Sequence, residues 1–333
     1  MIPAILGLAG PTLSPDERAF IRAADPAGFI LFARNCRDKI QLRALTDALS
    51  DLSGRDNLPI LIDQEGGRVA RLKPPEWPEF PAQGRFAALY ARAPISAIEA
   101  ARVNAQAIAC VLAECGVNVD CLPLLDLPQP DADEIIGDRA LGAEPMQVAA
   151  LGRAVLDGLA AGGCVGIVKH VPGHGRATAD SHKQLPVVEA NAETLEWDLA
   201  PFRALRDATM AMVAHILYRA WDGERPASLS PKIVAEVVRG KIGFDGLLMT
   251  DDLAMNALTG APGGRAAAAL AAGCDLALHC SGNLADNEAI AAALGEIAPR
   301  SRDRLERAMA GTGQGAGDYA ALAAKRDALL ALV

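Results

Sequence analysis

The chain of 333 residues is 51% hydrophobic and 22% charged, which excludes a disordered or fibrous protein and is typical of a globular one. Its formal net charge is −9 and it has no basic run, so we expect no nucleic-acid partner. Seven cysteines without a C-x-x-C pair favour reduced thiols over disulfides or a thiolate zinc site. We find no apolar stretch of about 18 residues and no basic leader, and therefore expect a cytoplasmic protein without a membrane segment.

Short apolar runs alternate with longer segments of helical spacing along the whole chain. Strands are predicted at 3–8, 28–32, 59–63, 117–125, 165–170, 212–217, 247–251 and 275–279. Helices are predicted at 15–24, 39–52, 95–115, 145–162, 192–207, 231–241, 264–272 and 283–297.

This alternation predicts the fold class. Repeated βα units whose strands are apolar on both faces indicate an α/β protein with a closed (β/α)8 TIM barrel. We expect residues 1–333 to form one catalytic domain, with C-terminal helices at about 301–333 packed on the outside of the barrel. A dinucleotide-binding sheet is disfavoured, because the glycines of segment 6–10 do not complete a G-x-G-x-x-G motif.

Polar residues gather where the predicted strands end. Buried charges are costly unless they are paired, so such a ring at the active-site end of a barrel indicates a polar ligand. The ring comprises Asp63 after the third strand, Asp126 after the fourth, Lys169 and His170 in the fifth, His215 within the sixth, and Asp251 with Asp252 in the seventh.

The loop after the fifth strand carries candidate acid/base chemistry. It holds three of the five histidines within segment 170–182. Asp180 and His182 are separated by one residue, so the carboxylate can orient the imidazole, and a histidine titrates near neutral pH. Asp251 is a candidate nucleophile, because a carboxylate at a strand end can attack an electrophilic carbon. Spacing alone leaves the choice between Asp251 and Asp252 open.

Three segments together resemble a known family. They are 63–71, with sequence DQEGGRVAR; 169–182, with KHVPGHG followed by DSH; and 250–255, with TDDLAM. They occur in the same order in the bacterial β-N-acetylhexosaminidases of glycoside hydrolase family 3, and the length is similar to that of compact single-domain members. Val171 departs from the aromatic residue of many relatives, and Asp138 replaces a glutamate in the family's Gly-Glu-Arg segment.

The resemblance implies a retaining double displacement without a cofactor or metal. Asp251 would be the nucleophile, and His182, paired with Asp180, the acid/base. The residues implied to hold N-acetylglucosamine are Asp63, Arg71, Arg139, Lys169 and His170. The implied partner is a small-molecule carbohydrate, N-acetylglucosamine β-1,4-linked to anhydro-N-acetylmuramic acid with or without peptide. The sequence carries no indication of oligomeric state.

Two other functions fit the same residues. A metal-dependent barrel hydrolase would use His174, His182, His215 and Asp251 as ligands. A non-catalytic barrel would bind an amino sugar without cleaving it. More ordinary roles are also expected for individual residues: a buried, hydrogen-bonded His215, a loop-shaping His174, and a solvated, capping or supporting Glu65 in a turn.

Overall fold

The computed structural model describes residues 1–130, 132–181, 183–313, 315 and 317–333. Eight parallel strands close into a barrel in the order β1-β10-β9-β7-β5-β4-β3-β2, so the predicted single-domain (β/α)8 barrel is confirmed. The barrel strands are β1 (Ile2–Gly7), β2 (Pro26–Leu31), β3 (Ile60–Ile62), β4 (Val119–Asp120), β5 (Val165–Val171), β7 (Met210–Val213), β9 (Leu247–Asp252) and β10 (Leu276–His279).

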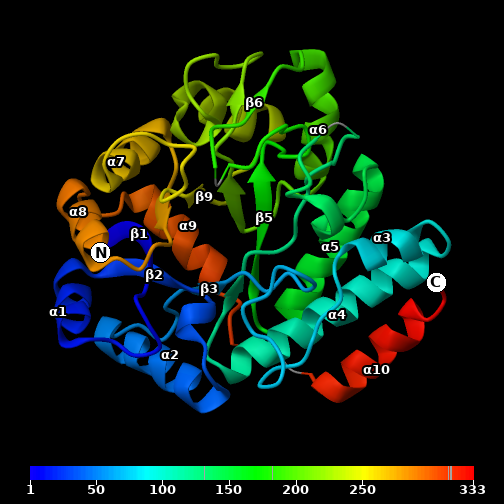
Figure 1. Ribbon diagram of the computed structural model, residues 1–333, viewed down its shortest axis with the longest axis horizontal. Helices are drawn as coiled ribbons and strands as arrows, with labels where there is room; N and C mark the ends of the chain where they lie inside the picture. The colour runs from blue at the N-terminus through cyan, green and yellow to red at the C-terminus, as the bar shows by residue number, and fades with distance from the viewer. Residues whose placement is uncertain (131, 182, 314, 316) are drawn as a thin grey trace.

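Helices surround this barrel on its outer side (Figure 1). They are α1 (Pro15–Ala24), α2 (Lys39–Ser53), α3 (Gly84–Tyr90), α4 (Pro94–Glu114), α5 (Pro145–Ala161), α6 (Ala192–Ala204), the π-helix η4 (Ile233–Ile242), α7 (Pro262–Ala272), α8 (Leu284–Ala293), α9 (Pro299–Met309) and α10 (Tyr319–Leu330). Short 3-10 turns lie at η1 (Ala33–Asn35), η2 (Gly137–Arg139) and η3 (Ala227–Leu229).

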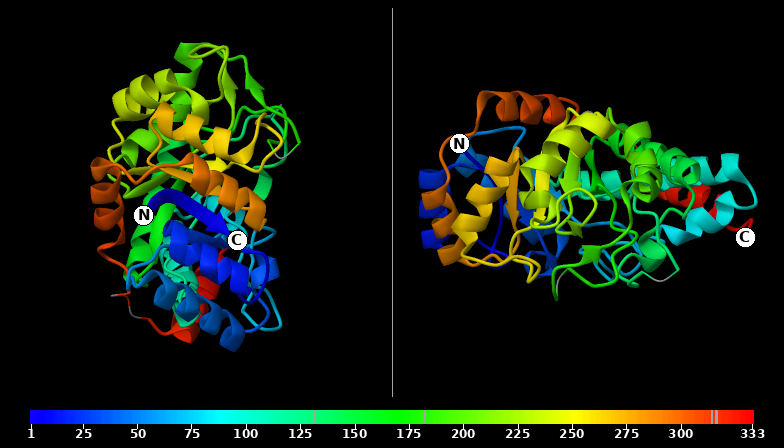
Figure 2. Two further views of the ribbon diagram at one scale, coloured as in Figure 1. Left: turned by 90° about the vertical axis from the view of Figure 1, so that its left-hand side faces the viewer. Right: turned by 90° about the horizontal axis from the view of Figure 1, so that it is seen from above.

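Side chains alternate along the strands between the barrel interior and the helical layer. In β9, for example, Leu247 and Met249 belong to the interior cluster, whereas Leu248 packs with the outer cluster. Leu305 and Met309 of α9 also join the interior cluster. Helix α9 lies across one end of the barrel (Figure 2) and fills it with apolar side chains.

The sequence predictions differ from the structure at several boundaries. The fourth strand is only Val119–Asp120, and the sixth ends at Val213, so the expectation that His215 lies within that strand is wrong. Segment 231–241 was expected to be an ordinary helix but forms most of a π-helix. Helix α3 and the small parallel sheet of β6 (Val187–Val188) and β8 (Leu217–Tyr218) were not predicted. These elements are too short to give a clear hydrophobic periodicity in the sequence.

Helix α4 corrects the expectation about apolar length. By length and composition it could cross a membrane, although no such segment was expected. Most of its apolar window is buried inside the protein, and it packs against α3, α5 and α10. These contacts are those of a core helix.

Candidate active site

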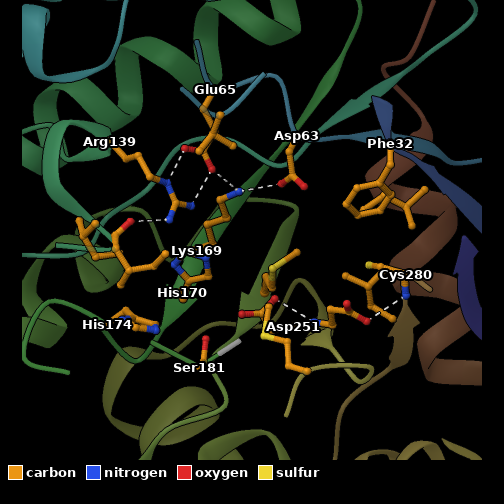
Figure 3. Close-up of a pocket in the computed structure, with 18 of the residues that line it drawn as sticks. Phe32, Asp63, Glu65, Arg139, Lys169, His170, His174, Ser181, Asp251 and Cys280 are labelled. Atoms are coloured by element: carbon orange, nitrogen blue, oxygen red, sulfur yellow. Dashed lines mark hydrogen bonds and ion pairs between the residues drawn. The ribbon is translucent and has the colours of Figure 1, made fainter. Parts of the chain in front are cut away.

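A polar pocket opens at the carboxyl ends of the barrel strands. It encloses about 910 Å³, counted to its open mouth, a size suited to a sugar-sized ligand. Its wall carries residues from almost every strand end (Figure 3). Among them are Phe32, Asp63, Glu65, Arg68, Arg71, Arg139, Lys169, His170, His174, Ser181, Asp251, Asp252 and Cys280. All five predicted sugar-binding residues and the predicted nucleophile therefore line one pocket.

One wall is a network of buried ion pairs. Lys169 Nζ lies 3.0 Å from Asp63 Oδ1 and 2.7 Å from Glu65 Oε1. Glu65 also accepts two hydrogen bonds of 2.8 Å from the Nε and Nη2 of Arg139. Arg71 Nη2 pairs with Asp63 Oδ2 at 2.9 Å, and its guanidinium stacks over the ring of Phe32. The network holds the amino and guanidinium groups in fixed positions at the pocket wall.

Glu65 was expected to be a solvated, capping or supporting residue of a turn. The structure excludes the solvated role, because its side chain is fully buried between Lys169 and Arg139 and holds both of them. The available signal was its place two residues after Asp63, which lets both carboxylates reach the same lysine. Sequence alone could not show that Arg139, 74 residues away, folds back onto it.

The oppositely charged groups of this wall keep one another in their charged forms. Burial raises the pKa of Asp63 and Glu65. Lys169 outweighs this effect together with Arg71 at Asp63 and with Arg139 at Glu65, so both pKa values fall below their ordinary range. Burial lowers the pKa of Lys169, and the two carboxylates outweigh it and raise the pKa above its ordinary value. All three groups are therefore charged at neutral pH.

Asp126 holds the start of the loop after β5. It is fully buried and accepts hydrogen bonds from the main-chain nitrogens of His170, at 3.2 Å, and His174, at 2.7 Å. Its Oδ2 lies 2.8 Å from His170 Nδ1. Burial raises the pKa of Asp126, but His170 and His174 together outweigh it and lower the pKa to about 2. A carboxylate at this distance requires a proton on Nδ1, so Nε2 is the nitrogen of His170 left for the pocket.

The structure distinguishes the orientations of Asp251 and Asp252. Asp251 follows Leu247 and Met249 on the interior face of β9, and its Oδ1 accepts a 2.8 Å hydrogen bond from the nitrogen of Asp252. Asp252 Oδ1 instead accepts from the nitrogens of Ala254 and Cys280, each at 2.9 Å. Asp252 therefore fastens the two neighbouring loops together, although it also borders the pocket.

Asp251 is held in its charged form. Burial raises its pKa, but the imidazoles of His170 and His215 and the N–H of Asp252 outweigh this effect and lower the pKa. A buried, ionised carboxylate has the electron pair that nucleophilic attack requires.

His215 has the ordinary role expected for it. It is fully buried, and its Nδ1 lies 2.6 Å from Ser228 Oγ while its Nε2 lies 3.0 Å from the carbonyl oxygen of Asp252. With both ring nitrogens engaged, it cannot supply a metal ligand as it stands. No group of three or more metal-ligating side chains occurs within the part of the chain that the structure describes.

The predicted acid/base pair is only partly described. His182 lies outside the described residues. Asp180 lies in an adjoining pocket with Arg68, Ile135 and Lys183, and its Oδ2 is 3.5 Å from Lys183 Nζ. The two pockets share Arg68 and Ile135, so this loop borders the mouth of the main pocket. Ser181, between Asp180 and His182, lines the main pocket itself.

Comparison with known proteins identifies the family. The model of the glycosyl hydrolase family 3 N-terminal domain matches residues 6–308. The chain belongs to glycoside hydrolase family 3. A beta-hexosaminidase of Bordetella avium is 37% identical over 92% of this chain and 88% of its own, and one of Alkalilimnicola ehrlichii is 40% identical over 84% and 80%. The predicted class of enzyme, a glycosidase of the β-N-acetylhexosaminidase type, is confirmed.

Solved structures agree with this family. NagZ from Neisseria gonorrhoeae, in complex with N-trifluoroacetyl-D-glucosamine, has a TM-score of 0.85 and 30% identity over 99% of this chain and 96% of its own. A family 3 β-N-acetylglucosaminidase from Paenibacillus has a TM-score of 0.86 and 30% identity over 98% of this chain and 66% of its own. The similarity of both structures to this chain thus extends over the whole barrel.

Proposed function

We propose that this glycosidase removes terminal β-linked N-acetylglucosamine from peptidoglycan fragments in the cytoplasm, by double displacement with retention. The observation that carries the proposal is Asp251: an ionised carboxylate on the interior face of β9, at a pocket lined by polar groups. The Neisseria protein, which binds an N-acylated glucosamine, supports the class of sugar. The muropeptide leaving group follows from the family resemblance.

In the first step, a carboxylate oxygen of Asp251 forms a bond to the anomeric carbon while the bond to the leaving oxygen breaks. His182, oriented by Asp180, donates its proton to that oxygen. In the second step, His182 takes a proton from water, whose oxygen attacks the same carbon and releases Asp251. A histidine avoids the repulsion that a second carboxylate would create beside Asp251.

Asp63, Arg71, Arg139, Lys169 and His170 hold the sugar in this proposal. The ion pairs fix Lys169 and Arg139 before substrate arrives, so little freedom is lost on binding. His170 Nε2 offers a further hydrogen-bonding position because Asp126 occupies Nδ1. Hydroxyl groups of the sugar are suitable partners for all of these groups.

Replacement of Asp251 tests the proposal. We expect Asp251→Asn to lower kcat for an aryl β-N-acetylglucosaminide by about 10³-fold or more, because the amide is a poor nucleophile. The matched change Asp252→Asn retains an acceptor oxygen for the two loop nitrogens and should keep most activity. Steady-state kinetics of the two folded variants tests this. If Asp252→Asn loses activity and Asp251→Asn keeps it, Asp252 rather than Asp251 is the nucleophile.

Stereochemistry tests the proposed retention separately. Proton NMR of the first-formed sugar should show the β-anomer before mutarotation. An α-anomer would contradict double displacement while leaving the hydrolase activity itself in place.

A further inference from the structure

His174 lies in the pocket wall without a role in the steps described above. Its side chain is almost completely buried, at 4% exposure, and it lines the same pocket as Asp251 and Ser181. Figure 3 shows its ring beside His170, on the side of the pocket where Ser181 and Asp251 lie. The rings of His170 and His174 meet edge to face, with centroids 5.6 Å apart.

The ring of His174 is held in place but is not satisfied. Its main-chain nitrogen is bound to Asp126, which fixes the backbone below the ring. Its buried Nδ1 has no hydrogen-bond partner among the described residues. His215, by contrast, uses both ring nitrogens. Because Nδ1 is enclosed and unpartnered, Nε2 is the nitrogen left for a hydrogen bond to a ligand in the pocket.

The environment also determines the form of the ring. Burial and the neighbouring His170 lower the pKa of His174, although Asp126 and Asp251 act in the opposite direction. The ring is therefore neutral at neutral pH, with one proton on one nitrogen. A buried N–H without an acceptor is rarer than a buried acceptor without a donor, so the proton belongs on Nε2 rather than on the enclosed Nδ1.

We propose that His174 contacts the substrate and donates a hydrogen bond from Nε2 to the carbonyl oxygen of the 2-acetamido group. This inference rests on the proposed function, in which Asp251 attacks carbon 1. His174 and Asp251 line the same pocket, and Figure 3 shows them on the same side of it, which puts His174 near the substituents of carbons 1 and 2. The amide oxygen on carbon 2 is the strongest uncharged acceptor of this sugar, and a neutral N–H donor suits it.

Kinetics with two N-acyl groups test this contact. Fluorine weakens the amide oxygen as an acceptor, so aryl β-glycosides carrying an acetyl or a trifluoroacetyl group on nitrogen are compared. We expect His174→Leu to lower kcat/KM about tenfold for the acetyl substrate and clearly less for the trifluoroacetyl one. A merely structural role would lower both values by the same factor, and that result would overturn the inference.

Two further variants serve as references. His174→Asn keeps an N–H donor and should retain more of the preference for the acetyl substrate than His174→Leu does. His279→Leu removes another buried imidazole, which lies outside the pocket and also has an unpartnered Nδ1, and should leave the ratio of the two kcat/KM values unchanged.

A direct readout needs no variant. Nitrogen-15 NMR of the wild-type histidines should find the His174 proton on Nε2, with a shift when N-acetylglucosamine is added and none with glucose. A proton on Nδ1, or equal responses to both sugars, would overturn the inference. If the wild type hydrolyses neither aryl glycoside, the proposed function fails together with it; if it does and only the His174 results disagree, the proposed function stands.

Discussion

At the scale of single residues, the pocket depends on carboxylates that act through their neighbours. Asp126 does not line the pocket, yet it accepts hydrogen bonds from both His170 and His174. The sequence placed it only among the polar residues at the strand ends. The structure favours a positioning role, because the carboxylate is fully buried beneath the loop.

Replacement of Asp126 by asparagine should change the tautomer of His170. The asparagine oxygen can still accept from the main-chain nitrogens, but its NH₂ group would face His170 Nδ1 and favour a proton on Nε2. We expect kcat/KM for an aryl β-N-acetylglucosaminide to fall about 10- to 100-fold, as when a residue that orients an imidazole is lost. Nitrogen-15 NMR of His170 measures the tautomer directly.

Asp275 provides a matched control for this change. It is also a buried carboxylate, but it pairs with Arg239 and Arg304 and does not line the pocket. Asp275→Asn should lower stability and leave kcat/KM of the folded enzyme nearly unchanged. Normal activity and a normal His170 tautomer in Asp126→Asn would contradict the positioning role.

At the scale of elements, strand alternation and helix packing decide which side chains reach the pocket. Strand β9 places Asp251 on the face of Leu247 and Met249, and helix α9 fills the opposite end of the barrel with Leu305 and Met309. The barrel beneath the site is therefore closed by apolar side chains of a helix that follows the last strand in the chain. The interior side chains of the strands that carry the polar residues pack in the same apolar cluster as this helix.

Replacement of Leu305 tests how much α9 contributes to the stability of the fold. Its side chain is 6% exposed, and Leu305→Ala should lower the free energy of unfolding by about 2 to 5 kcal/mol, because a cavity replaces buried methyl groups. Leu332, 55% exposed near the C-terminus, is the control, and Leu332→Ala should change it by no more than about 0.5 kcal/mol. Urea denaturation compares the two; similar small effects would mean that α9 is not part of the core.

At the scale of the whole molecule, buried charge near the pocket links folding to pH. Asp120 of β4 is fully buried, accepts a 2.9 Å hydrogen bond from the nitrogen of Gln64, and has a second oxygen, Oδ2, without a partner among the described residues. Burial raises the pKa of Asp120 to about 7, with Asp63 and Glu65 adding to the increase and Lys169 opposing it. The folded protein therefore keeps a proton there that the unfolded chain loses near pH 4.

The pKa difference of Asp120 between the folded and unfolded states determines how stability changes with pH. A raised pKa in the folded state stabilises the protein fully below about pH 4, and that contribution is lost as the pH rises towards 7, by an amount on the order of 4 kcal/mol. Asp120→Asn removes the effect, so the unfolding free energy of the variant relative to wild type should increase between pH 4 and pH 8. Urea denaturation at both pH values measures it, and a constant difference would show that Asp120 does not hold the proton.

The sequence by itself determined the barrel, the family and most of the pocket residues. The alternation of apolar strands and amphipathic helices is a local pattern, and the family motifs are short segments at strand ends, so both can be recognised without long-range contacts. The tertiary structure decided which way Asp251 and Asp252 point, that Glu65 pairs with Arg139, and that α9 fills the barrel. These depend on strand alternation in three dimensions and on the cost of burying an unpaired charge, which only the folded chain defines.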